Sequence, residues 1–227
     1  MTIIIITGGT VDTDFASSFI KQMNNQSGVD MFIAVDGGLG HADKLGIRPD
    51  ILVGDFDSAD PEVLSRYIDA PDIEVRRFNP VKDYTDTDLA IRTAIEKGAN
   101  CIYILGASGT RTDHMLGSIH CLKQALDAGV RCYLVDTNNR IHLMGGIMPQ
   151  PVPYTEVLHR DNQWGKYVSL IALTNEVSHV NLSGFAYNMT DGTFCVGQSL
   201  GISNEIVDDS AIISVEQGIL IVAESRD

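Results

Sequence analysis

The sequence has few basic residues and no long hydrophobic run. Lysine and arginine number 16 against 30 aspartate and glutamate residues, and the formal net charge is −14. Nucleic-acid surfaces and anionic membranes are bound by clustered Lys and Arg, so we expect neither nucleic acid nor membrane among the partners. The run Ile3–Ile6 is too short for a signal peptide, and no other apolar run approaches the roughly 18 residues of a membrane span. These absences predict a cytoplasmic protein.

Cysteine is also scarce. Cys101, Cys121, Cys132 and Cys195 are widely spaced, and Cys101 and Cys132 lie in apolar, strand-like runs. Buried thiols are therefore predicted in preference to disulfides or a zinc site. With 227 residues, of which 44% are apolar and 20% charged, the chain has an ordinary globular composition and room for one large domain or two small ones.

The first part of the chain alternates short apolar runs with stretches of helical periodicity. Strands are predicted over residues 2–7, 31–35, 51–54, 73–78, 101–105 and 131–135, with helices between them. This alternation is typical of an α/β domain with a mainly parallel, Rossmann-like sheet. Ligands of such sheets bind just beyond the carboxyl ends of the strands.

Two carboxylates directly follow one of these strands. The apolar run that begins at Ile51 stops at Gly54 and is followed by Asp55 and Asp57. Alternate residues of an extended segment point the same way, so both carboxylates can face one site, where a cation is needed to neutralise them. Hard oxygen ligands favour Mg²⁺. In the plain structural alternative, Asp55 caps a turn and Asp57 is solvated.

A second acidic stretch places Asp83, Asp86 and Asp88 beside Lys82. Thr85 and Asp88 fit a capping box at the start of a helix, so part of this stretch has a structural explanation. A cap uses only one or two acids. Together with Asp55 and Asp57, the stretch therefore predicts that at least two of its residues act on metal or phosphate.

A third candidate region is the glycine-rich loop over residues 106–110, which leads into a helix. Backbone N–H groups of such a loop can bind an anion, and Arg111 adds donors suited to phosphate or carboxylate. The loop matches neither the dinucleotide fingerprint nor a Walker loop. His114 at the helix start has either a chemical role or an ordinary surface role, and the sequence does not decide between them.

The pattern of alternating strands and helices ends near Asn139. Two glycines at 145 and 146 and the prolines at 149, 151 and 153 indicate a connector. Beyond it, short β-branched strands are predicted over residues 167–173, 177–181, 193–196, 211–215 and 219–223, without any stretch of helical periodicity. We therefore predict an α/β domain over residues 1–145 and an all-β domain, a small sandwich or barrel, over residues 146–227.

Five short motifs occur in order along nearly the whole chain: Asp36-Gly37-Gly38, Gly54-Asp55-Phe56-Asp57-Ser58, Lys82-Asp83-Tyr84-Thr85-Asp86, Arg111-Thr112-Asp113-His114 and Gly201-Ile202-Ser203-Asn204-Glu205. Together they resemble the thiamin pyrophosphokinase family. The resemblance implies transfer of the pyrophosphoryl group of ATP to the hydroxyl of thiamin, which gives thiamin diphosphate and AMP. It also implies an ATP- and Mg²⁺-binding α/β domain, a thiamin-binding and dimerising β-sandwich, and a homodimer with active sites at the subunit interface.

The resemblance also implies roles for individual residues. The catalytic residues, which would hold Mg²⁺, would be Asp55, Asp57 and Asp86. ATP and its phosphates would be bound by Asp36, Lys82, Asp83, Thr85, Arg111 and Asp113. Thiamin would be bound by Tyr187, Ser203 and Asn204. Tyr187 stands where the family often has Trp; its ring either stacks on thiamin or packs in the core. Which carboxylate accepts the hydroxyl proton stays open.

Two other classes of protein share parts of this pattern. An apolar strand followed by Asp-x-Asp also begins phosphatases with an aspartyl nucleophile, but that function leaves residues 82–88 and the β domain unexplained. A non-catalytic thiamin- or nucleotide-binding protein would keep the pocket without turnover. Release of AMP, in place of ADP or inorganic phosphate, distinguishes the three.

Overall fold

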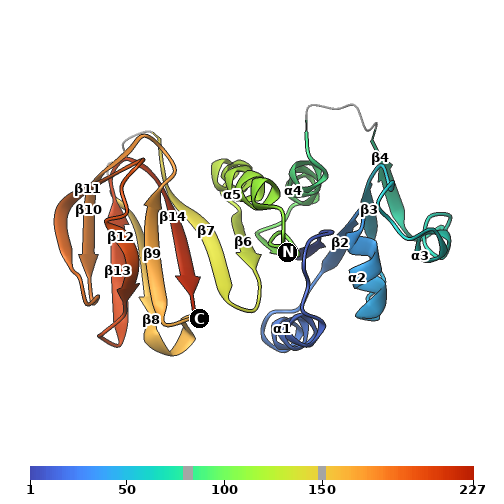
Figure 1. Ribbon diagram of the computed structural model, residues 1–227, viewed down its shortest axis with the longest axis horizontal. Helices are drawn as coiled ribbons and strands as arrows, with labels where there is room; N and C mark the ends of the chain where they lie inside the picture. The colour runs from blue at the N-terminus through green and yellow to red at the C-terminus, as the bar shows by residue number, and fades with distance from the viewer. Residues whose placement is uncertain (79–83, 148–151) are drawn as a thin grey trace. The chain divides into compact units, whose positions relative to one another are not determined.

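The computed structural model of this chain describes residues 1–78, 84–147 and 152–227. They form two compact units, Met1–Thr137 and Asn138–Asp227. The labelled α-helices all belong to the first unit, whereas strands dominate the second (Figure 1). Lys82 and Asp83 of the second acidic stretch lie outside the described residues.

The first unit contains a parallel sheet of six strands in the order β6-β5-β1-β2-β3-β4. The strands are β1 Thr2–Ile6, β2 Met31–Val35, β3 Ile51–Gly54, β4 Glu74–Arg77, β5 Cys101–Leu105 and β6 Arg131–Val135. The strand order reverses between β1 and β5. In open α/β sheets this switch point is where ligands bind. The predicted Rossmann-like sheet is confirmed.

Helices cover both faces of this sheet. They are α1 Thr13–Gln26, α2 Gly38–Lys44, α3 Pro61–Ser65, α4 Asp86–Glu96 and α5 Thr112–Asp127. α4 and α5 lie on one face and α1 and α2 on the other (Figure 1). The β-branched run Ile3–Ile6 is fully buried between the two layers, as expected for a central parallel strand. None of the helices in the described ranges is long and apolar enough to cross a membrane.

The second unit consists of two antiparallel sheets with the orders β12-β9-β14-β7 and β11-β10-β13-β8. The strands are β7 Asn139–Gly146, β8 Tyr154–His159, β9 Tyr167–Ala172, β10 Glu176–Ser183, β11 Met189–Cys195, β12 Gly201–Glu205, β13 Ser210–Val215 and β14 Gly218–Ser225. Buried residues of both sheets, among them Val168, Val222, Val180 and Ile213, share one core. The predicted sandwich is confirmed.

The sequence-based prediction misses β7, β8 and β12, and it misreads two glycines. Gly145 and Gly146 belong to β7, where they pair with Ile219 and Gly218, and do not form a connector. A Cβ at Gly145 would lie 2.2 Å from the Gly218 carbonyl oxygen, so this glycine marks a close approach of two backbones. Prolines 149 and 151 of the predicted connector lie outside the described residues.

All four cysteines are free thiols. Cys101 and Cys132 are buried, as the sequence predicts, and burial raises the pKa of both thiols. Their raised pKa keeps them protonated and unreactive, as is usual for structural cysteines.

An ion pair joins β7 to β14 inside the second unit. The Glu224 side chain is 1% exposed, and its carboxylate accepts hydrogen bonds from Arg140 Nε at 2.6 Å and Nη2 at 2.8 Å. The Trp164 backbone N–H donates to the same carboxylate at 2.9 Å. Each carboxylate oxygen therefore has a donor, which offsets the cost of burying the charge.

Replacing Arg140 by methionine should destabilise the protein. Removing one partner of a buried ion pair costs about 3 kcal/mol because the other charge stays buried without compensation. We expect the urea-unfolding free energy to fall by that amount in Arg140→Met and to recover in Arg140→Met/Glu224→Gln, where no charge is left. Arg48→Met, which breaks an exposed pair with Asp72, should change stability little. Equal losses in the single and double variants would contradict this account.

Candidate active site

A cavity of about 680 Å³ lies in the first unit at the switch point of its sheet. Its walls come from the loops after β1, β2, β3 and β5 and from the N-terminal ends of α4 and α5. The lining residues include Thr7–Thr10, Asp36, Asp55, Thr85, Asp86, Gly106–Arg111 and His114. Segments far apart in the sequence therefore meet at one edge of the sheet.

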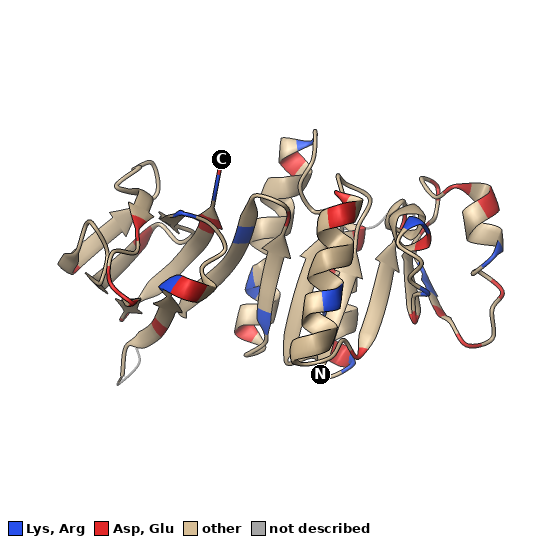
Figure 2. Cartoon of the chain, turned by 90° about the horizontal axis from the view of Figure 1, so that it is seen from below, with Lys and Arg blue, Asp and Glu red and all other residues tan. Residues whose placement is uncertain are grey.

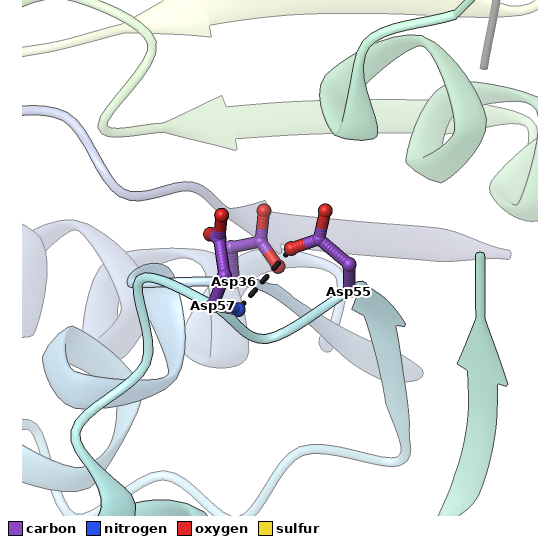
Figure 3. Close-up of side chains that lie close together, drawn as sticks. All are labelled: Asp36, Asp55 and Asp57. Atoms are coloured by element: carbon purple, nitrogen blue, oxygen red, sulfur yellow. Dashed lines mark hydrogen bonds between the residues drawn. The ribbon is translucent and has the colours of Figure 1, made fainter. Parts of the chain in front are cut away.

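Three carboxylates gather at this edge. Asp36 follows β2, and Asp55 and Asp57 follow β3; one oxygen of each lies within 4.8 Å of the others. Figure 3 shows the three side chains pointing to the same side. Carboxylate oxygens at this spacing are the ligands that Mg²⁺ prefers. The chemistry of this donor set therefore fits a divalent cation.

The carboxylates are brought together by a turn and not by the strand alternation expected from the sequence. β3 ends at Gly54, and Phe56 has a left-handed backbone with φ 65°. The Phe56 ring is 6% exposed, so burial of the ring turns the flanking carboxylates outward. Asp36 Oδ1 accepts the Phe56 backbone N–H at 2.9 Å, and Asp55 Oδ1 accepts the Asp57 N–H at 3.1 Å.

Gly54 is required for this arrangement. A Cβ at Gly54 would lie 2.0 Å from Asp36 Oδ1, and the glycine has φ 144°. Any side chain here would displace the carboxylate that accepts from the Phe56 N–H. The glycine that ends the strand in the sequence thus makes room for a neighbouring acid.

The crowding of acids disfavours negative charge on Asp36. Burial, a hydrogen bond to Asp86 and the charges of Asp86 and Asp55 raise the pKa of Asp36 from 3.8 to about 7. Acidic residues elsewhere add to the negative field: they outnumber basic ones by 30 to 16 and are spread over helices and loops of both units (Figure 2). A bound cation would remove this penalty.

The described part of the second acidic stretch has two uses. Asp86, the first residue of α4, lines the cavity, and so does Thr85, whose Oγ1 caps the helix by accepting the Asp88 N–H at 3.2 Å. Asp88 turns away from the cavity: its carboxylate accepts from Arg92 Nε at 2.6 Å and from Gln124 Nε2 at 2.8 Å. Asp88 therefore joins α4 to α5, which is a structural role.

The loops after β1 and β5 form the opposite wall. The Gly9 N–H donates to the Gly106 carbonyl at 2.9 Å, and the Thr10 N–H to the Ser108 carbonyl at 2.8 Å. A Cβ at Gly9 would lie 2.1 Å from the Gly106 oxygen, so only glycine fits. His41 of α2 donates from Nε2 to the Gly9 carbonyl at 2.9 Å. Burial lowers the pKa of His41. No sequence motif singles out this histidine.

Arg111 and Asp113 pair with each other at the start of α5. Arg111 Nη2 donates to Asp113 Oδ2 at 2.6 Å, and both side chains are about two-thirds exposed. Arg111 and His114 line the cavity. Since Asp113 contacts Arg111, its carboxylate can orient the guanidinium.

The residues assigned to thiamin lie together in the second unit. Tyr187 is 75% exposed, so the alternative of a core aromatic is wrong. Asn204 is buried, and its side-chain amide both accepts the Tyr187 N–H at 3.0 Å and donates to the Tyr187 carbonyl at 2.8 Å. Asn204 thus fixes the backbone that presents the exposed ring. Ser203 has φ 58°, and its N–H donates to Ser169 Oγ.

An acidic cavity at the switch point of a parallel sheet is typical of enzymes that use a divalent cation on phosphorylated substrates. Residues 20–134 match the family model "Thiamin pyrophosphokinase, catalytic domain", and residues 155–220 match "Thiamin pyrophosphokinase, vitamin B1 binding domain". The chain is 32% identical to thiamine pyrophosphokinase of Bacillus subtilis over an alignment of 197 residues. The alignment covers 87% of this chain and 88% of the relative.

Solved structures agree with these matches. The crystal structure of the Bacillus subtilis thiamine pyrophosphokinase superimposes on this chain with a TM-score of 0.84 and 30% identity, and the superposition covers 100% of each chain. That of Geobacillus thermodenitrificans thiamin pyrophosphokinase has a TM-score of 0.80 at 30% identity, over 100% of this chain and 98% of the other. The chain belongs to the thiamin pyrophosphokinase family and is a transferase of the kinase type. The family predicted from the five motifs is confirmed.

Replacing Asp36 by asparagine should change how stability depends on pH. The pKa of Asp36 is raised from 3.8 to about 7 in the folded protein. The folded state therefore holds this proton more tightly than the unfolded chain, and the stability it contributes is complete below 3.8 and lost as the pH rises through about 7.

In metal-free buffer, the urea-unfolding free energy of the wild type should fall relative to that of Asp36→Asn across this pH window. Asp127→Asn, which changes an exposed acid paired with Lys123 on α5, should follow the wild type. Parallel profiles for the wild type and Asp36→Asn would contradict the raised pKa.

Proposed function

We propose that this enzyme transfers the pyrophosphoryl group of ATP to the hydroxyl of thiamin and releases thiamin diphosphate and AMP. The observation that carries this proposal is the cluster of Asp36, Asp55 and Asp57, of which Asp36 and Asp55 line the switch-point cavity, within the segment that matches the catalytic family model. ATP is then bound by the first unit. Thiamin is bound by the second, within the segment that matches the vitamin B1 binding model.

Charge neutralisation and positioning are the main requirements of this reaction. Asp55, Asp57 and Asp86 would hold Mg²⁺, with Asp36 beside them, and the ion when bound neutralises charge on the phosphates. Arg111 and the N–H groups of the loop after β5 bind phosphate oxygens. In this proposal Lys82 and Thr85 would also contact phosphate oxygens, and Asp83 would line the ATP pocket. A carboxylate at the site takes the proton of the thiamin hydroxyl.

The second unit supplies an aromatic surface for thiamin. Tyr187 offers an exposed ring to the heterocycles of thiamin, and Asn204 holds the Tyr187 backbone. Ser203 precedes Asn204 on β12. A Tyr ring gives a smaller stacking area than Trp, and its hydroxyl can accept as well as donate a hydrogen bond, whereas the Trp indole only donates.

We also propose a cytoplasmic homodimer with active sites at the subunit interface. Val157 and Ile212 are register partners on β8 and β13 and are 47% and 40% exposed. Exposed apolar pairs on a sheet favour a contact with another protein surface. Four free thiols fit a reducing compartment.

The reaction is tested by its products after incubation with ATP, Mg²⁺ and thiamin. We expect AMP and thiamin diphosphate in equal amounts, and only when all three are present. ADP or inorganic phosphate without AMP would favour the phosphatase, and binding without turnover would favour the non-catalytic protein. Asp55→Asn should lower kcat by at least about 100-fold, since it removes the negative charge of a proposed metal ligand. Asp127→Asn, away from the cavity, should keep the wild-type rate.

The role of Tyr187 is tested with thiamin and ATP in parallel. Tyr187→Ala should raise the KM for thiamin about five- to tenfold because stacking is lost, and should leave the KM for ATP nearly unchanged. Tyr187→Phe keeps the ring and should stay within about twofold of the wild type. Equal effects on both substrates would remove Tyr187 from the thiamin site.

A further inference from the structure

One aromatic ring lies on the wall of the cavity. Tyr84 stands directly before Thr85, the cap of α4, and is 49% exposed although it lines the cavity. Among the described lining residues it is the one with a phenyl ring; the others are small, polar or acidic, apart from Val35 and His114. The capping box and the carboxylate cluster leave this ring without a function.

The ring is supported from outside the cavity by an ordered chain of contacts. The Arg92 guanidinium lies over the Tyr84 ring, 4.6 Å from its centroid, and Arg92 does not line the cavity. Arg92 Nε is bound to Asp88, whose side chain is 13% exposed and is in turn bound to Gln124 of α5. A ring held in this way loses little further freedom when a ligand stacks on it.

Other cation–π pairs that involve a tyrosine lack this setting. Arg48 lies over Tyr67 and Lys166 over Tyr167, at 6.0 Å and 5.0 Å, and neither tyrosine lines the cavity. A cation–π contact by itself therefore does not indicate a binding site, and what distinguishes Tyr84 is its position on the cavity wall. Unlike those two tyrosines, Tyr84 presents a half-exposed ring in the cavity that we assign to ATP.

The cavity favours a nucleobase as the group that stacks there. All its lining residues belong to the first unit, whereas the vitamin B1 binding model covers residues 155–220 of the second. A flat, uncharged heterocycle also suits a ring that already contacts the Arg92 cation, because a second cation such as the thiazolium would be repelled by Arg92. In the proposed function, the acids that line the same cavity, Asp36, Asp55 and Asp86, are assigned to the metal ion and the phosphates, which leaves the base to the aromatic ring.

We infer that Tyr84 is the stacking platform for the adenine ring of ATP and that it sets a preference for purine over pyrimidine triphosphates. This inference rests on the proposed binding of ATP by the first unit. Stacking area grows with the size of the base, so a two-ring purine gains more than a one-ring pyrimidine. Tyr84 acts on binding of the nucleotide and takes no part in transfer of the pyrophosphoryl group.

Binding measurements by calorimetry test this without turnover. Tyr84→Leu should raise the Kd for Mg-ATP about tenfold and leave the Kd for inorganic triphosphate, which has no base, unchanged. Tyr84→Phe should bind both as the wild type does. Tyr67→Leu, a tyrosine with a similar cation–π contact outside the cavity, serves as the matched control and should change neither. Thermal melting confirms that each variant is folded.

The outcomes separate this inference from the proposed reaction. Failure of the reaction shows as absence of AMP from the wild type, whereas failure of the stacking shows as unchanged ATP binding in Tyr84→Leu. Equal weakening of ATP and triphosphate would place Tyr84 at the phosphate end, and a rise in the KM for thiamin alone would assign the ring to the other substrate; both overturn the inference. The wild type should also bind ATP several-fold more tightly than CTP, and equal affinities would overturn it without any variant.

Discussion

The close approach of like charges at one edge of the parallel sheet is the constraint on which this structure depends. Asp36, Asp55 and Asp57 come from the ends of two neighbouring strands, and Asp86 begins the helix above them. Such a cluster persists only if the backbone holds it, because repulsion alone would spread the side chains. The hydrogen bond from the Phe56 N–H to Asp36 and the left-handed turn at Phe56 provide that hold. Burial of the Phe56 ring offsets the cost of the strained turn.

The position of α4 is also fixed by specific contacts. This helix begins with Asp86, which lines the cavity. On its inner side Arg76 of β4 donates to Thr93 Oγ1 at 3.1 Å, and Thr93 is 1% exposed. Asp88 and Gln124 join the same helix to α5. These contacts lie away from the chemistry, yet they fix where the cap of α4 and its first carboxylate stand. Hydrogen bonds from polar side chains of β4 and α5 thus hold α4, and with it Asp86, in position at the site.

Sequence reasoning predicts the parts of this protein that are governed by regular patterns. Continuous β-branched runs such as Ile3–Ile6 give the parallel strands, and Asp55 and Asp57 are visible because acids directly follow an apolar run. β12 is missed because Gly201–Glu205 is mostly polar and lies at the edge of its sheet. β7 is missed because Gly145 reads as a break when no partner strand is in view. Local patterns do not contain the partner of a close backbone contact.

The same limit applies to supporting residues of the site. His41 and Asn204 act by binding the backbone of Gly9 and Tyr187, which are 32 and 17 residues away. Neither residue type in isolation indicates such a contact. His41 lies in none of the five motifs, and its contact becomes visible only when the fold places the Gly9 carbonyl beside it. Asn204 lies in the fifth motif, but the motif does not indicate that this buried side chain binds the Tyr187 backbone.

The buried acid Glu224 of the second unit and the half-buried acid Asp36 of the first are stabilised in opposite ways, and this difference bears on function. Glu224 has an internal cation, because Arg140 binds both of its oxygens and Trp164 adds a backbone donor. Asp36 has no basic side chain bound to it among the described residues; it meets an N–H and other acids, and its pKa rises to about 7. An acid that is neutralised from within the protein serves stability. An acid that is held among other acids lowers stability at neutral pH, and the arrangement becomes favourable when a cation arrives from outside. The carboxylate cluster of the first unit therefore has the electrostatics of a binding site, whereas the ion pair of the second has those of a core contact.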